Sequence, residues 1–398
     1  MNGIPRLRDY DGPALLSYGF RPFFLFGAVY AGVAVLAWLP MFNGELELWS
    51  ALSPVDWHVH EMLYGYLPAV VTGFLLTAIP NWTGRLPIQG MPLLALVGVW
   101  VAGRVCVTCS AEIGWLMAAG IDVSFLALVV AAAAREIVAG RNWRNLRVVG
   151  LVTLLLAGNV AFHIEAHVQG TAEYGARIGI AAIVLLIALI GGRIVPSFTR
   201  NWLARENPGR LPAPVGRFDA AAIAITAATL ALWTVQPIGR MTAAALAASA
   251  ALNFIRLGRW AGDRTCRDRL VLILHVGYAF VPIGFLLASA AAIDLVPASA
   301  GIHAWTVGAA GTMTLAVMTR ASLGHTGNAL AASAMTQAIY VAIIAATLAR
   351  VCASLEPGWN DVLLHVTALA WCIAFFGFAL SFGPMLMRGR RATAARAL

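Results

Sequence analysis

The histidines of this 398-residue chain are the residues whose positions best suit metal or cofactor binding. Six of the eight histidines fall at the predicted outer ends of apolar segments: His58, His60, His163, His167, His303 and His365. Imidazole and charged groups are costly at membrane depth, so those that persist there usually face a cavity or a cofactor. Neutral imidazole is the commonest protein ligand of haem iron and copper, and the bias toward one side therefore predicts a metal or haem site.

The spacing of these histidines limits how they can converge. His163 and His167 are four residues apart, so a helix places both on one face. His58 and His60 are two residues apart, about 200° around a helix, so only one of them points inward unless the stretch is extended. Glu61 is a candidate to orient an imidazole or to accept a proton. For any single histidine, the alternative is a solvated or carbonyl-bonded side chain at the membrane interface.

Two further groups have simpler explanations. Cys106 and Cys109 form a C-x-x-C pattern, a soft-ligand candidate, but we favour the interpretation that they are two small core residues of an apolar helix. Asp122 lies inside an apolar segment and is a candidate for a proton path. Its other interpretation, an ion pair with Arg104 at the end of the preceding segment, is the one we favour.

Composition identifies the elements that must position these residues. The chain is 60% hydrophobic and only 11% charged, whereas soluble proteins average roughly 25% charged residues. Apolar blocks of about twenty residues predict helices that cross a bilayer, and they do not alternate as the strands of a β-barrel would. The expected fold is an all-α integral membrane protein. Twelve transmembrane helices are predicted, near 25–41, 59–80, 92–108, 113–134, 148–166, 172–194, 218–235, 239–257, 270–293, 299–318, 329–353 and 361–384.

Charge patterning orients these helices. Every basic residue is Arg, and with twelve spans 23 of the 27 fall in the loops on the side of both termini. The positive-inside rule makes that side cytoplasmic, which indicates a multi-pass membrane protein with both termini in the cytoplasm. The formal net charge of +9 therefore needs no nucleic-acid partner.

One membrane domain accounts for nearly the whole chain. We expect a cytoplasmic N-terminal segment over 1–24, the transmembrane domain over 25–384 and a basic cytoplasmic tail over 385–398. The Arg- and Pro-rich stretch 195–217 reads as a cytoplasmic connector. A shift of 243 residues superposes His60 on His303 and Gly65 on Gly308, which suggests a pseudo-repeat of four-helix units. Coincidence among Gly- and Ala-rich helices is the alternative.

Several long strings resemble the ordered signatures of the NnrS family. They are Gly-Phe-Arg-Pro-Phe-Phe at 19–24, Trp-His-Val-His-Glu-Met at 57–62, Gly-Phe-Leu-Leu-Thr-Ala-Ile-Pro-Asn-Trp-Thr-Gly at 73–84, Gly-Gly-Arg-Ile-Val-Pro-Ser-Phe-Thr-Arg-Asn at 191–201 and Met-Thr-Arg-Ala-Ser-Leu-Gly-His-Thr-Gly at 318–327. The resemblance covers residues 18–385. It implies a twelve-helix protein of the bacterial inner membrane that contains haem and copper and takes part in the response to nitric oxide.

The resemblance also carries over particular residues. Its motifs include His58, His60, Glu61, His303, Arg320 and His325. Glu61 and Arg320 are expected to act in catalysis, and His58, His60 and His303 to bind haem, taken as b-type, or copper. His325 and His365 are added as metal ligands, and His163 and His167 as cofactor ligands by position and spacing. Which histidine binds which metal stays open.

Three functions follow as alternatives. The leading one is a haem and copper protein that binds nitric oxide and so protects the cell against nitrosative stress. Such a protein could also reduce nitric oxide, with quinol as the electron donor. Histidines on spans two and ten also resemble the haem-copper oxidase superfamily, but spans six and seven lack the histidines that hold copper there, which leaves reductase activity open. A secondary transporter without a redox cofactor, or an assembly protein, would bind no metal.

Overall fold

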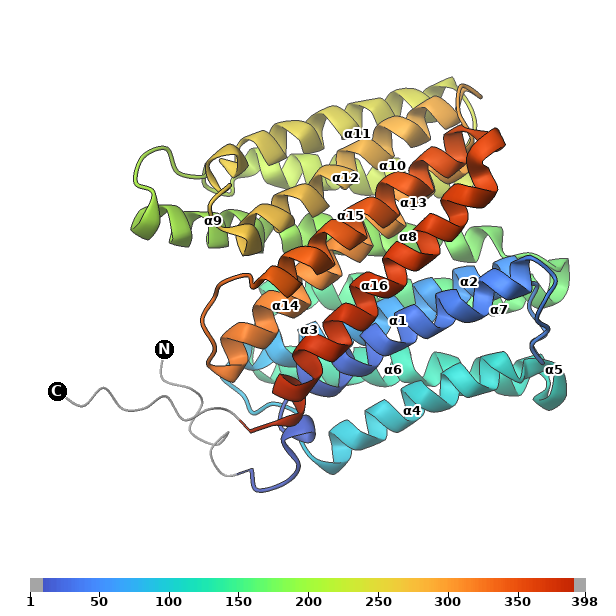
Figure 1. Cartoon of the computed structure of the whole chain (residues 1–398), viewed down its shortest axis with the longest axis horizontal. Coiled ribbons are helices and arrows are strands. Elements are labelled where there is room, and N and C mark those ends of the chain that lie inside the picture. The colour runs from blue at the N-terminus through green and yellow to red at the C-terminus, as the bar shows by residue number, and fades with distance from the viewer. Residues whose placement is uncertain (1–9, 390–398) are drawn as a thin grey trace. The chain divides into compact units, whose positions relative to one another are not determined.

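All regular structure in residues 10–389, the part of the chain that the computed structural model describes, is helical. Eleven of these helices are long and apolar enough to cross a membrane, and they identify a multi-pass membrane protein (Figure 1). They are Phe20–Phe42, Pro54–Thr83, Met91–Thr108, Trp115–Ala139, Trp143–Gln169, Glu173–Glu206, Arg217–Val235, Arg240–Arg264, Arg269–Ala291, Ala334–Leu355 and Pro357–Met387.

Eleven of the twelve predicted spans each overlap one of these helices. The exception is the span expected at 299–318, where the chain forms continuous helix from Ala298 to Thr326 but is not among the eleven. Glycine, threonine and histidine make this segment less apolar than the others. The count of twelve and the cytoplasmic location of both termini therefore stay predictions. The basic tail predicted at 385–398 lies mostly outside the described residues.

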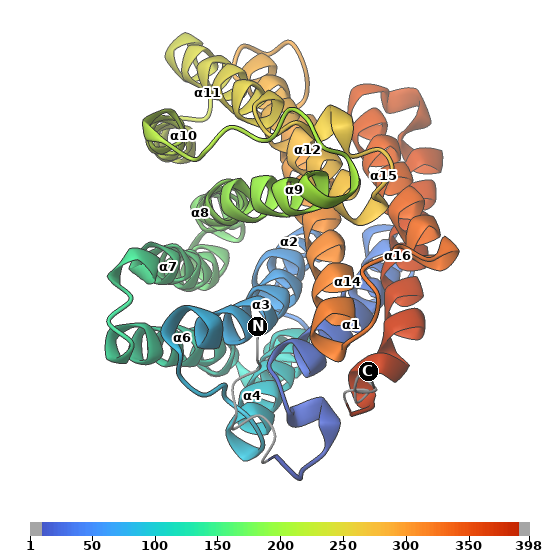
Figure 2. The same ribbon diagram turned by 90° about the vertical axis from the view of Figure 1, so that its left-hand side faces the viewer.

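The chain divides into two compact units. The first contains residues up to Gly179 together with Met318–Leu330 and the chain from Phe375 onward. Its helices are α1 (Phe20–Phe42), α2 (Pro54–His60), the π-helix η3 (Glu61–Tyr66), α3 (Leu67–Thr83), α4 (Met91–Thr108), α5 (Ser110–Ile113), α6 (Trp115–Ala139) and α7 (Leu146–Gln169). Within this unit α1 packs on α3, and α6 packs on both α4 and α7 (Figure 2).

The second unit contains Ile180–Val317 and Ala331–Ala374. Its helices are the π-helix η5 (Ile187–Gly191), α9 (Gly192–Glu206), α10 (Arg217–Val235), α11 (Arg240–Gly258), α12 (Arg269–Ala291), α13 (Ala298–His303), the π-helix η7 (Ala304–Gly311) and α15 (Ala334–Leu355). Three helices contribute residues to both units: α8 (Glu173–Leu186), α14 (Thr312–Thr326) and α16 (Asn360–Met387). Within the second unit α11 packs on α10 and α12.

The first motif of the sequence has a structural role in the first unit. A Cβ atom at Gly19 would collide with the side chain of Leu76, so glycine permits the close approach of the chain to α3. The buried guanidinium of Arg21 donates 2.7 Å hydrogen bonds to the carbonyl oxygens of Leu386 and Arg388 at the end of α16. A cation that satisfies the last carbonyls of a helix stabilises that end.

The π-helices bear on the predicted repeat. His60 directly precedes η3, and His303 directly precedes η7, so the 243-residue shift aligns the first residues of both π-helices. The third π-helix, η5, lies in the helix predicted as span six. Because π-helices are rare and frequently occur at functional sites, the shared position supports the repeat and marks the residues around His60 for closer study.

The predicted connector at 195–217 is shorter than expected. Helix α9 continues to Glu206, with Pro196 inside it, so only residues 207–216 are non-helical. Pro196 lies in the first turns that follow η5, where the backbone has already departed from α-helical hydrogen bonding. Sequence reasoning read arginine and proline together as a loop, whereas proline is tolerated near such an irregular turn.

Candidate metal centre

Local sequence signals place His60 at depth in the first unit. The Ser53 side chain accepts a hydrogen bond from the backbone N–H of Asp56, and Pro54 occupies the first turn, so α2 begins where a cap and a proline predict a helix start. Helical geometry then separates the two histidines of this turn. His60 is completely buried, while His58 is half-buried and stacks on Trp38 with ring centroids 4.1 Å apart.

Three donor atoms from three helices converge beside His60. His60 Nε2 lies 3.2 Å from His163 Nε2 on α7 and 3.2 Å from Asp122 Oδ2 on α6. The third separation, from His163 Nε2 to Asp122 Oδ2, is 3.1 Å. All three residues are buried, and among the described residues they form the one group of three or more His, Cys, Asp or Glu side chains with metal-binding geometry. We call His60, Asp122 and His163 the triad.

A guanidinium holds the carboxylates around the triad. Arg104 on α4 donates from Nη1 to Glu61 Oε2 at 2.6 Å and from Nη2 to Asp122 Oδ1. Glu61 also accepts a hydrogen bond from the hydroxyl of Tyr30 on α1. The pairing of Arg104 with Asp122 is the one that the sequence favoured. Arg104, Glu61 and Asp122 are all buried, so each charge depends on these partners.

The hydrogen-bond directions leave the centre of the triad rich in acceptors. Glu61 Oε1 lies 2.9 Å from His60 Nδ1 and, as a carboxylate, can only accept, so Nδ1 carries the proton and a neutral His60 presents a lone pair at Nε2. That lone pair faces Asp122 Oδ2 and, at 3.1 Å, Asn159 Oδ1. Asn159 Nδ2 donates to Asp122 at 2.8 Å, which fixes the orientation of the amide. Several acceptors directed at one point favour a bound cation.

Charge and spacing lead to the same interpretation. Two carboxylates and one guanidinium give the buried group a net charge of −1 when both imidazoles are neutral. A positive ion at the triad reduces this imbalance, which a low-dielectric interior otherwise penalises. Ligands 2.0–2.1 Å from one ion at tetrahedral angles lie about 3.3–3.4 Å apart, close to the observed separations. Two imidazole nitrogens and a carboxylate oxygen suit copper, zinc or non-haem iron.

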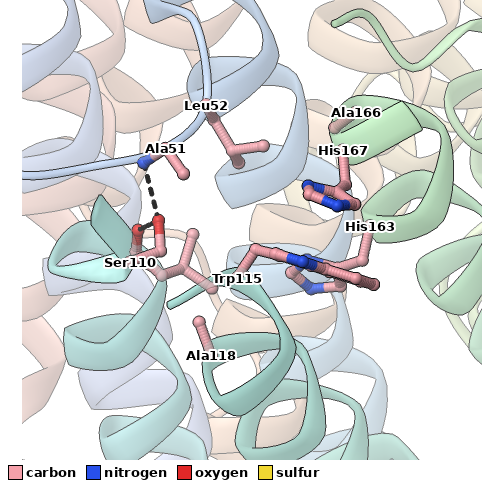
Figure 3. A pocket seen from close by; sticks show the side chains of 9 residues that line it. Ala51, Leu52, Ser110, Trp115, Ala118, His163, Ala166 and His167 are labelled. Atoms are coloured by element: carbon pink, nitrogen blue, oxygen red, sulfur yellow. Dashed lines mark hydrogen bonds between the residues drawn. The ribbon is translucent and has the colours of Figure 1, made fainter. Parts of the chain in front are cut away.

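A cavity of about 140 Å³ lies against one side of the triad. Figure 3 shows His163 and His167 projecting from α7 toward Trp115 at the start of α6. His167 stacks on Trp115 with ring centroids 4.1 Å apart. Pockets that accept drug-sized ligands measure about 300–1,000 Å³, so this cavity suits a small molecule and does not fit a porphyrin.

Comparison with protein families identifies a match. The family model described as NnrS protein matches residues 14–390, nearly the whole chain. The chain belongs to the NnrS family. Family membership indicates a role in the response to nitric oxide. No curated protein sequence matches the chain.

The structure brings together some of the residues predicted for this NnrS-family protein and separates others. His60, His163 and Glu61 lie in one network, whereas His58 and His167 each stack on a tryptophan outside the triad. Of the four imidazoles predicted at outer helix ends that lie in the described part of the first unit, two belong to the triad, together with the carboxylate of Asp122.

The remaining predicted residues lie elsewhere in the two units. His325 and Arg320 belong to the part of α14 in the first unit, where the His325 ring lies 5.4 Å from that of Phe20. His303 and His365 belong to the second unit. His303 Nδ1 lies 2.7 Å from the carbonyl of Ser299, and His365 is exposed with Nδ1 2.9 Å from the carbonyl of Asp361.

Sequence reasoning missed two members of the network. Asn159 holds both His60 and Asp122, and it precedes His163 by four residues, a spacing that places both on one helix face. An amide inside an apolar span was therefore an available signal. Tyr30 gave no such signal, because a tyrosine in an apolar run is also expected in a helix that only faces the membrane.

Glycine at position 65 of this NnrS-family protein makes room for the network. A Cβ atom there would lie 2.5 Å from Arg104 Nη1 and 2.8 Å from Glu61 Oε2. We expect Gly65→Ala to displace the guanidinium and to lower stability by about 1–3 kcal/mol, the usual cost of overpacking. Thermal unfolding of the detergent-purified variants measures the effect.

The matched control is Gly98→Ala on α4. Nothing lies within 4 Å of a Cβ atom at Gly98, which is exposed. Alanine is a better helix former than glycine by about 1 kcal/mol, so this variant should equal or exceed the parent protein. Equal melting temperatures for both variants would contradict the steric role of Gly65.

Proposed function

We propose that this protein is a metal-containing membrane protein of the bacterial inner membrane that binds nitric oxide and so protects the cell against nitrosative stress. The observation that carries the proposal is the triad, a buried acceptor-rich site in a chain of the NnrS family. Nitric oxide is small and uncharged, so it can reach such a site through the bilayer. Transition metals with an accessible coordination position capture it.

Copper is the metal that we assign to the triad. His60 and His163 supply imidazole nitrogens and Asp122 a carboxylate oxygen, a donor set that suits copper among the metals implied by the family. The carboxylate of Glu61 would orient the His60 ring, as acidic partners of metal-binding imidazoles do. Bound copper would supply a redox-active ion that can coordinate nitric oxide.

Haem does not fit beside the triad, because the adjoining cavity is too small for a porphyrin. The haem proposed from the family resemblance would therefore use imidazoles outside the triad. The candidates are His58, His303, His325 and His365, since His167 borders the cavity that is too small. Reduction of nitric oxide would further need electrons, for which we propose quinol, and protons, for which Glu61 is the nearest carboxyl group to the triad besides Asp122.

The test is a spectrum and metal analysis of detergent-purified protein. We expect copper in the preparation, a pyridine haemochrome signal from haem, and an absorbance change on addition of nitric oxide. A secondary transporter would instead be colourless and metal-free, with no response to nitric oxide. A metal-free preparation that stays metal-free after incubation with copper would contradict the proposal.

A further inference from the structure

Aliphatic and polar groups line the cavity beside the triad in similar measure. The aliphatic residues are Ala51, Leu52, Val107, Ala118 and Ala166. The remaining lining residues are Ser110, Trp115, His163 and His167. None of the nine is acidic, Lys or Arg, so the wall offers no strong attraction to a charged molecule.

One polar group of the wall, the Ser110 hydroxyl, is satisfied by the protein itself. The Ser110 hydroxyl donates to the carbonyl of Val107 at 2.8 Å and accepts from the backbone N–H of Ala51 at 2.8 Å. The indole of Trp115 and the imidazole of His167 lie face to face at an interplanar angle of 16°. The cavity therefore combines aliphatic side chains with the rings of Trp115, His163 and His167, and its size suits a small molecule.

His163 connects the cavity to the triad. Its side chain lines the cavity, while its Nε2 lies 3.2 Å from His60 Nε2 and 3.1 Å from Asp122 Oδ2. His60 is completely buried and is not part of the lining. A molecule in the cavity would thus approach the triad from the side of His163.

We propose that this cavity is the binding chamber through which a small uncharged diatomic molecule, nitric oxide, reaches the triad. The inference rests on the proposed function for the identity of the guest. Size excludes quinones and porphyrins, and the wall contains no Lys or Arg that would attract nitrite or nitrate. The chamber is defined by the ends of α4, α6 and α7 and the segment that holds Ala51 and Leu52.

Filling the chamber tests the inference without touching a candidate ligand. Ala118→Leu places a larger side chain in the cavity wall, and Ala166→Leu does so from α7 as a second variant. The matched control is Ala131→Leu, an exposed position on the same helix α6 as Ala118. All three variants keep His60, Asp122 and His163, so copper content should equal that of the parent protein.

Two probes are measured on the purified proteins. The first is xenon, followed by ¹²⁹Xe NMR, since xenon reports whether the cavity admits a small uncharged guest regardless of metal content. We expect saturable xenon binding in the parent protein and in Ala131→Leu, and its loss in Ala118→Leu or Ala166→Leu. The second probe is nitric oxide in stopped flow. We expect its association rate to fall at least about tenfold in the filled variants, with the final spectral change unaltered.

The outcomes separate this inference from the function on which it rests. Unchanged xenon binding, or an unchanged association rate, in a filled variant that keeps its copper would overturn the chamber. If the parent protein gives no spectral change with nitric oxide, the proposed function fails. Saturable xenon binding then still shows whether the cavity admits a small uncharged guest.

Discussion

Replacement of His60 or His163 by alanine should remove copper from the purified protein, whereas replacement of His58 or His167 should not. The first two supply nitrogens to the triad, and the last two stack on Trp38 and Trp115. Loss of a residue that only orients a ligand already costs about 10–100-fold in metal affinity. We therefore expect at least a tenfold fall in bound copper for each triad variant, measured by mass spectrometry after dialysis.

Chemical rescue distinguishes the two ligands. In His163→Ala the lost ring borders the cavity, so added imidazole can enter and occupy its place. In His60→Ala the space is sealed, because His60 is completely buried and does not line the cavity. We expect imidazole to restore copper in the first variant only.

The stacked histidines serve as the control in the same series. His58→Ala and His167→Ala lose an aromatic contact and no triad nitrogen, so copper content should match the parent protein. Equal copper loss in all four variants would indicate a global effect of substitution. Full retention in His60→Ala and His163→Ala would exclude the triad as the copper site.

Much of this site is visible in the sequence because side-chain spacing along one helix is a local property. The two-residue separation of His58 and His60 predicts that only one points inward, and the structure buries His60 alone. Likewise, Arg104 and Asp122 are expected to pair because consecutive spans are usually neighbours, and the structure places them in contact.

The identity of the third ligand could not be predicted in this way. Whether Asp122 also reaches two imidazoles depends on how α6 is placed against α7 and α2, which carry His163 and His60, and no periodicity along the chain encodes this placement. Helix packing also limits what can be predicted for His303 and His365. Predicted membrane depth alone grouped them with the histidines of the other helices. The π-helix that follows His60 leaves no compositional signal either, since its residues are those of an ordinary apolar helix.

Substitution of Arg104 by methionine should destabilise the metal-free protein more than any other single change in the network. The guanidinium of Arg104 pairs with both Glu61 and Asp122. Its removal leaves these two buried carboxylates without their cationic partner. Breaking a buried ion pair by removing one partner costs about 3–5 kcal/mol. Thermal unfolding in the presence of a chelator measures this loss.

Copper should restore much of the stability that Arg104→Met loses. Without the guanidinium, the net charge around the triad changes from −1 to −2 when the imidazoles are neutral, so a bound cation gains electrostatic stabilisation. The rise in melting temperature on addition of copper should therefore be larger in Arg104→Met than in the parent protein. An equal or smaller rise would mean that Arg104 does not share its charge-balancing role with a metal.

The second unit offers a control with the same chemistry but no imidazole at the ion pair. Arg256 is buried, pairs with Asp219 at 3.3 Å, and donates to the hydroxyl of Tyr278 at 2.6 Å and to the carbonyl of Ala188 at 3.2 Å. Arg256→Met should also unfold at a lower temperature, because Asp219 loses its cation. It should gain nothing extra from copper. A copper effect confined to Arg104→Met would show that the two buried arginines, alike in burial and pairing, differ in that one of them borders a metal site.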